Sequence, residues 1–85
     1  MNTFELEIVT PEKQVFAGSV QSVQVPGTQG SFQVLYNHAP VISTLSKGKI
    51  KLVKEDGNEE DFSMQDGVIE VLKNKVIVLV ERILE

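Results

Sequence analysis

The sequence of 85 residues contains no cysteine, no tryptophan and a single histidine, His38. The absence of cysteine excludes disulfides and thiolate metal sites. One histidine leaves little room for acid–base chemistry, because no nucleophile-elbow pattern surrounds Ser31, Ser43 or Ser46. A zinc site would need carboxylates for its other ligands, which is uncommon. We therefore expect no catalytic site, no metal site and no cofactor in this chain.

The chain also lacks a long apolar run and a dense group of basic residues. Its longest apolar run, Val76–Val80, is far shorter than the roughly 18–20 residues that cross a bilayer. Met1–Glu7 shows neither the basic nor the apolar region of a signal peptide. Twelve acidic against eight basic residues give a formal charge of -4. We expect a soluble protein that binds no nucleic acid, with the lysines at 47–54 on the solvated face of a strand.

Two further motifs resemble ligand sites only superficially. Acidic residues gather at 55–61, but their spacing does not match an EF-hand loop, so a solvated hairpin tip is preferred to a calcium site. The segment Gly27-Thr28-Gln29-Gly30 lacks the Gly-Lys-Ser/Thr ending of a phosphate loop. It is interpreted as a tight surface turn that its glycines permit.

The hydrophobic pattern has a period of two, which indicates strands. Phe4, Leu6 and Ile8 alternate with glutamates, as in a half-buried strand. A shift of phase at residues 21–22 predicts a bulge or bend in the next strand. Turn signals separate the apolar runs at Pro11-Glu12, Pro26-Gly27, Lys47-Gly48, Asp56-Gly57, Asp66-Gly67 and Lys73-Asn74. We predict one all-β domain over residues 1–85, a flattened antiparallel β-sandwich of about 8–10 short strands.

The most distinctive stretch runs from Gly27 to Pro40, with the sequence GTQGSFQVLYNHAP. It holds Phe32 and Tyr36 in polar surroundings, and the Ala39-Pro40 step forces an extended exit. Loops on a rigid sandwich often carry binding surfaces, and aromatic side chains supply anchoring area there. We predict a protein-binding loop, while the alternative that Phe32 and Tyr36 only close the end of the core stays open.

These residues resemble the signature of a known family. Gly27-x-x-Gly30 followed by Tyr36-Asn37-His38-Ala39-Pro40 is similar to the loop of the epsilon subunit of F-type ATP synthases. The resemblance covers nearly the whole chain, through the segments 6–12, 15–18, 23–27, 47–48, 56–57 and 67–71. Gln33 stands where the family often has a glycine, and Tyr36 where it often has a proline.

The resemblance implies a non-catalytic rotor subunit of the central stalk. Such a subunit links the gamma subunit to the membrane ring of c subunits and couples ion-driven rotation to ATP synthesis in the alpha/beta hexamer. It would lie at the cytoplasmic face of the bacterial inner membrane and touch the membrane only through the complex. By resemblance, Gly30, Ser31 and Phe32 face the ring and the region around His38 and Ala39 lies against gamma, with Tyr36 as a further protein-binding residue.

The length of the sequence limits what the resemblance implies. Most bacterial and plastid relatives continue into a two-helix domain, where the family places its inhibitory action and, in some members, an ATP-binding motif. Because the sequence ends at Glu85, neither property is carried over.

The rival hypothesis is a lipoyl- or biotinyl-type carrier domain, since Lys73 before Asn74 imitates the lysine at the hairpin tip of that class. The flanking residues lack the Asp-Lys or Met-Lys context of that class, and an intact mass would reveal its adduct.

Overall fold

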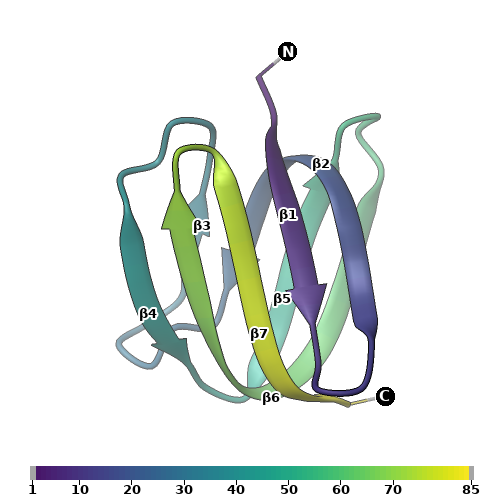
Figure 1. Cartoon of the computed structure of the whole chain (residues 1–85), viewed down its shortest axis with the longest axis vertical. Coiled ribbons are helices and arrows are strands. Elements are labelled where there is room, and N and C mark those ends of the chain that lie inside the picture. Colours follow the sequence, from purple (N-terminus) through teal and green to yellow (C-terminus); the bar gives the residue numbers. More distant parts are fainter. Residues whose placement is uncertain (1, 85) are drawn as a thin grey trace.

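The computed structural model describes residues 2–84 (Figure 1). These residues contain seven strands: β1 (Phe4–Val9), β2 (Gln14–Val25), β3 (Phe32–Val34), β4 (Val41–Leu45), β5 (Gly48–Lys54), β6 (Glu59–Leu72) and β7 (Lys75–Leu84). In β1 the apolar residues are buried and the residues between them are not, as the alternation of side chains along a strand requires. No helix occurs in the described part of the chain, hence none long and apolar enough to cross a membrane.

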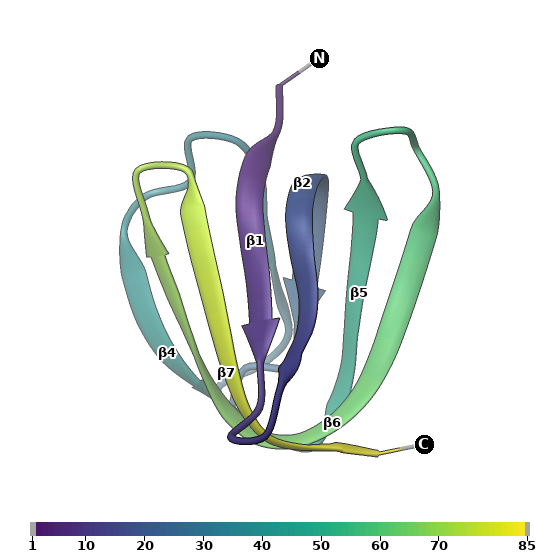
Figure 2. The same cartoon turned by 45° about the vertical axis from the view of Figure 1, so that its right-hand side comes forward.

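Three long strands bend, so each contributes to both layers of the sandwich. The first half of β2 pairs with β1 and its second half with β5 and β3. β6 pairs first with β5 and then with β4, and β7 follows β6 through both layers. What we call the first layer consists of β4, the second half of β6, the first half of β7, β1 and the first half of β2. The second layer consists of β3, the second half of β2, β5, the first half of β6 and the end of β7 (Figure 2).

The strand count and the pairing refine the prediction. The structure has seven strands in residues 2–84, whereas the sequence predicts about 8–10 shorter ones. The prediction of a turn at Asp66-Gly67 is wrong, because Asp66, with φ of 56°, lies at a bend inside the continuous strand β6. Gln65 and Gly67 on either side stay paired with β7 in one register. Because β2, β6 and β7 each contribute to both layers, each layer contains five strand segments. The pairing is also not wholly antiparallel, since β1 and β7 run parallel.

The two hairpins predicted from local turn chemistry are confirmed. Lys73 and Asn74 join β6 to β7 with φ of 50° and 61°, the positive values that a two-residue primed turn demands. Asp56-Gly57 lies in the turn between β5 and β6. The phase shift at residues 21–22 is a shift of register between β2 and β5. There the Gln21 side-chain amide donates to the carbonyl oxygens of Lys54, at the end of β5, and Glu55, each at 3.2 Å.

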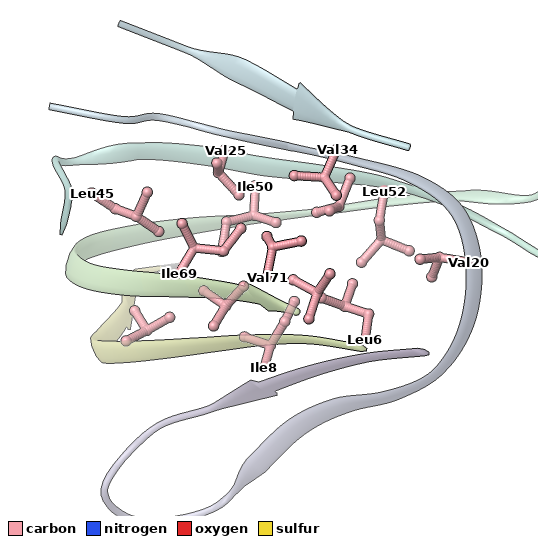
Figure 3. Packing of buried hydrophobic residues seen from close by; sticks show 14 of the residues in the cluster. Leu6, Ile8, Val20, Val25, Val34, Leu45, Ile50, Leu52, Ile69 and Val71 are labelled. Atoms are coloured by element: carbon pink, nitrogen blue, oxygen red, sulfur yellow. The ribbon is translucent and has the colours of Figure 1, made fainter. Parts of the chain in front are cut away.

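The core lies between the two layers and is apolar. No polar or charged side chain among residues 2–84 is buried. Leu6 and Ile8 from β1 lie on one side of the cluster, and Ile50 and Leu52 from β5 lie on the other (Figure 3). Close packing of this kind transmits strain with little deformation. The connections between strands are therefore held by a stiff body.

Candidate protein-binding surfaces

The stretch from Gly27 to Pro40 is two connections, whereas the sequence pattern predicts one loop. β3 divides it, because Phe32–Val34 pairs with Val23–Val25 of β2. Residues 26–31 lie beside the β4–β5 connection, and residues 35–40 lie beside the β6–β7 turn, at opposite ends of the sandwich (Figure 1). The predicted binding residues are accordingly separated into Gly30, Ser31 and Phe32 at one end and Tyr36, His38 and Ala39 at the other.

Hydrogen bonds fix the first connection to the end of β4. The Thr28 N–H donates to the Thr44 carbonyl at 3.0 Å, and the two hydroxyl oxygens of these residues lie 2.8 Å apart. The Ser46 N–H donates to the Pro26 carbonyl at 2.8 Å. The start of this connection, at Pro26 and Thr28, is therefore tied to the end of β4 and to Ser46, which follows it.

The tip of this connection is a tight turn with exposed residues. The Gly30 N–H donates to the Gly27 carbonyl at 2.9 Å, and Gly30 has φ of 127°, a conformation that glycine adopts without strain. Gly30 and Ser31 are exposed. Phe32 is only partly exposed and packs against the core, so the core-closing alternative describes Phe32.

A shallow groove with a volume of about 520 Å³ lies beside the same connection. It is lined by residues of the connection and by Lys47, Lys49 and Lys51, and no acidic side chain from residues 2–84 lines it. These three lysines are exposed, which confirms that they lie on a solvated face. The end that carries Gly30 and Ser31 is thus locally basic on a chain whose net charge is -4.

A reciprocal pair of asparagines holds the second connection. The Asn37 N–H donates to Asn74 Oδ1 at 2.7 Å, and Asn74 Nδ2 donates to Asn37 Oδ1 at 3.0 Å. The His38 N–H donates to the Leu35 carbonyl at 3.1 Å, which closes a turn. Both asparagines have positive φ, 65° and 61°, which asparagine tolerates better than most residues. The connection is therefore anchored to the β6–β7 turn.

Of the three predicted binding residues of the second connection, Tyr36 and Ala39 are exposed and His38 is partly exposed. Tyr36 is 42% exposed, and its neighbour Leu35 is 51% exposed. Ala39 is exposed as well. The Nδ1 atom of His38 lies 2.7 Å from the Ala39 carbonyl oxygen. For Tyr36, unlike Phe32, the core-closing alternative is not supported.

Sequence reasoning missed a third surface, the outer face of the first layer. Ile42 of β4, Leu72 of β6 and Leu79 of β7 are 72%, 50% and 53% exposed. In register, Ile42 lies beside Glu70, and Glu70 lies beside Ile77. The sequence feature that could have indicated this surface is the run Val76–Val80. It places apolar residues on both faces of one strand, which is typical of strands that are covered on both faces.

The outer face of the second layer is different. One row of paired positions across it consists of four exposed polar residues, namely Gln33, Gln24, Lys51 and Asp61. This is the composition of a face exposed to water. The exposed large apolar side chains of the strands therefore lie on the outer face of the first layer, while a polar row crosses the outer face of the second.

Two of the acidic side chains at residues 55–61 contact neighbouring residues of the chain. The Asp56 carboxylate accepts hydrogen bonds from the Asn58 N–H at 2.9 Å and from its side-chain amide at 3.0 Å. Glu60 pairs with Lys54 at 2.8 Å, and this hydrogen bond and charge raise the pKa of Lys54 above 10.5. No group of three or more histidine or acidic side chains in residues 2–84 is arranged to hold a metal ion.

Comparison with known proteins identifies the family. The sequence model of the family "ATP synthase, Delta/Epsilon chain, beta-sandwich domain" matches residues 3–85. Over 78 residues the chain is 45% identical to the ATP synthase epsilon chain of Chlorobium limicola, covering 92% of this chain and 89% of the relative. It is 42% identical over 80 residues to the ATP synthase epsilon chain of Campylobacter hominis, covering 93% of this chain and 62% of that relative.

Solved structures show the same fold at low identity. A chain of the Euglena gracilis mitochondrial ATP synthase, from a structure of OSCP, F1 and the c-ring, has a TM-score of 0.91 at 15% identity. The match covers 99% of this chain but 54% of that one, so this chain spans about half its length. A chain from the central stalk and c-ring of the Tetrahymena thermophila enzyme has a TM-score of 0.78 at 18% identity, with 95% and 65% covered.

Lys73 does lie at a hairpin tip, as the rival carrier hypothesis requires, but the family match is to another class of β-sandwich. The identities of over 40% along more than nine-tenths of the chain agree with the match. The chain belongs to the delta/epsilon family of ATP synthase subunits and is a non-catalytic, epsilon-type subunit of that membrane-associated complex.

Proposed function

We propose that this chain is a coupling piece of the central stalk, which links the gamma subunit to the c-subunit ring. It would pass ion-driven rotation of the ring to the alpha/beta hexamer, where ATP is made. In this proposal residues 1–85 act as one domain, at the cytoplasmic face of the bacterial inner membrane. The contact with the membrane is made only through the complex.

The contrast between the two outer faces of the sandwich supports this proposal best. The first layer exposes Ile42, Leu72 and Leu79, whereas the second layer exposes a polar row. Large apolar side chains exposed together on one face of a small protein are typical of a protein–protein contact. Leu35 and Tyr36 add exposed side chains at the end of the sandwich where Asn37 meets Asn74.

We assign this face, with Tyr36, His38 and Ala39, to the gamma subunit. A standard interface covers about 800 Å² on each partner, which is about 15% of the 5165 Å² surface of the chain. The outer face of one layer of five strand segments offers that area. The connection 35–40 then forms the rim of the interface, where its polar groups reach the partner.

We assign the opposite end, with Gly30 and Ser31 at its tip, to the c-subunit ring. The hydrogen bonds to Thr44 and Ser46 hold this turn in one shape, and a stiff, exposed turn can transmit force without yielding. Phe32 supports the turn from the core side. The two partners therefore bind at different places of one rigid body, as a coupling piece requires.

Separate binding assays test the two assignments. The purified gamma subunit and the detergent-solubilised c-ring are each titrated with wild type, with a Tyr36→Ala, His38→Ala double variant and with Ser31→Arg. We expect the double variant to lose about tenfold or more in affinity for gamma alone. We expect Ser31→Arg to lose affinity for the ring alone, because the added side chain holds the turn away from its partner.

Asp61→Ala, on the polar face, is the matched control and should bind both partners as wild type does. The proposal is contradicted if both loop variants are folded and bind gamma and the ring with unchanged affinity. An exchange of the two effects would show that the assignment of the ends is reversed.

A further inference from the structure

Glu70 is an exposed carboxylate in the middle of the apolar outer face of the first layer. In register, Ile42 of β4 lies on one side of it and Ile77 of β7 on the other. Val68 and Leu72 precede and follow it on the same face, because side chains two apart along a strand point the same way. Apolar residues thus surround Glu70 on all four sides.

Within residues 2–84 this carboxylate has no ion-pair partner, whereas its acidic neighbour does. The described residues contain two ion pairs, Lys54–Glu60 and Lys75–Glu7. Glu7 lies beside Ile77 in the same row as Glu70, and the Lys75 ammonium stands 3.4 Å from its carboxylate. Glu7 is therefore compensated inside the chain, and Glu70 is not.

Covering this face would bury an uncompensated charge. An exposed carboxylate is stable in water, but burying one without a partner is strongly unfavourable. A partner that seats on Ile42 and Leu79 must therefore bring a cation to Glu70 or bind weakly. The same requirement disfavours pairing of two copies through this face, because each Glu70 would meet a surface centred on another carboxylate.

We propose that Glu70 determines the specificity of the gamma-binding face. The partner surface that covers Ile42, Ile77 and Leu79 is apolar and carries one arginine or lysine side chain that pairs with Glu70. This inference rests on the proposed docking of the gamma subunit. It adds the chemistry that lets the face distinguish its partner from other apolar surfaces.

The test measures the affinity of the purified gamma subunit for wild type and four variants. Glu70→Gln keeps the shape and removes the charge, Glu70→Lys reverses it, and Ile42→Ser removes apolar area. Glu59→Lys is the matched control, since Glu59 is an exposed glutamate of the same strand in the second layer. Thermal unfolding of each variant shows that it is folded.

We expect Glu70→Gln to weaken binding by about 30-fold or more, because it leaves the cation of the partner buried and unpaired. Glu70→Lys should weaken it at least as much, and Glu59→Lys should leave it unchanged. Added salt should weaken wild-type binding more than it weakens binding of Glu70→Gln.

The outcomes separate this inference from the function on which it rests. If Ile42→Ser weakens binding while Glu70→Gln binds as well as wild type, gamma docks on this face and the cationic counterpart is refuted. If wild type fails to bind gamma, both the docking and the inference are overturned. If the wild-type chain instead dimerises and Ile42→Ser abolishes the dimer, a second copy occupies the face and the inference is wrong.

Discussion

Gly27 shows how a single residue sets the shape of a proposed contact surface. A Cβ atom added there would lie 2.7 Å from the Gly30 carbonyl oxygen and 3.0 Å from the Phe32 ring. The first of these is a backbone atom that cannot move without opening the turn. The close approach of residues 27 and 30 therefore requires that residue 27 has no side chain. This is the physical reason for the first glycine of the Gly27-x-x-Gly30 pattern.

We predict that Gly27→Ala lowers the free energy of unfolding by about 1–3 kcal/mol. Gly18→Ala is the control, because a Cβ there would lie 3.5 Å from the Phe16 ring, which is ordinary contact. It should change stability by less than about 0.5 kcal/mol or raise it slightly. Urea unfolding measures both values, and equal stabilities of the two variants would refute the steric argument.

At the scale of the element, the bend in β6 determines the architecture. Met64 is buried before the bend, and Ile69 and Val71 are buried after it, so the phase of the inward side chains changes between residues 64 and 69. Asp66, with φ of 56°, makes this change possible while the register with β7 is kept. One strand can then line both walls of the core.

We predict that Asp66→Gly leaves the free energy of unfolding unchanged or raises it by up to about 1 kcal/mol, because glycine relieves the left-handed conformation. Asp61→Gly in the straight part of the same strand should lower it by about 0.5–1 kcal/mol, because glycine weakens a strand interior. Urea midpoints compare the two variants. An equal loss in both would show that the bend carries no backbone strain.

At the scale of the whole molecule, the strands close on themselves. The order β1, β7, β6, β5, β2 returns to β1 through the β1–β2 pairing, and the bent strands belong to both layers. Neither layer can be removed without breaking strands of the other. A body of this kind yields as a unit, which suits the proposed transfer of torque between two partners.

We predict a single cooperative unfolding transition with a slope in urea of about 1 kcal/mol per molar. Hydrogen exchange resolved by peptide follows β1, which lies only in the first layer, and β5, which lies only in the second. Their amides should lose protection at the same urea concentration. Two separate midpoints would contradict both the cooperativity and the proposal that residues 1–85 are one domain.

The sequence by itself determined the class of fold, the hairpins and the family. Alternation of apolar residues is a local property of a strand. Lys73-Asn74 encodes its turn through the positive φ that both residues adopt, and in the longer β5–β6 turn Gly57 alone supplies a positive φ. The phase shift at residues 21–22 is also visible in the sequence, because it disturbs the alternation itself. The resemblance rests on the same kind of ordered local pattern.

Only the tertiary structure decided the division of Gly27–Pro40, the bend at Asp66 and the apolar outer face. β3 has three residues, too few to show a period, and it exists because β2 offers a partner. Asp66-Gly67 is typical of a turn, and pairing with β7 on both sides makes it a bend. In Val76–Val80 every residue is apolar, so only the register of neighbouring strands settles which side chains face the core and which face outward.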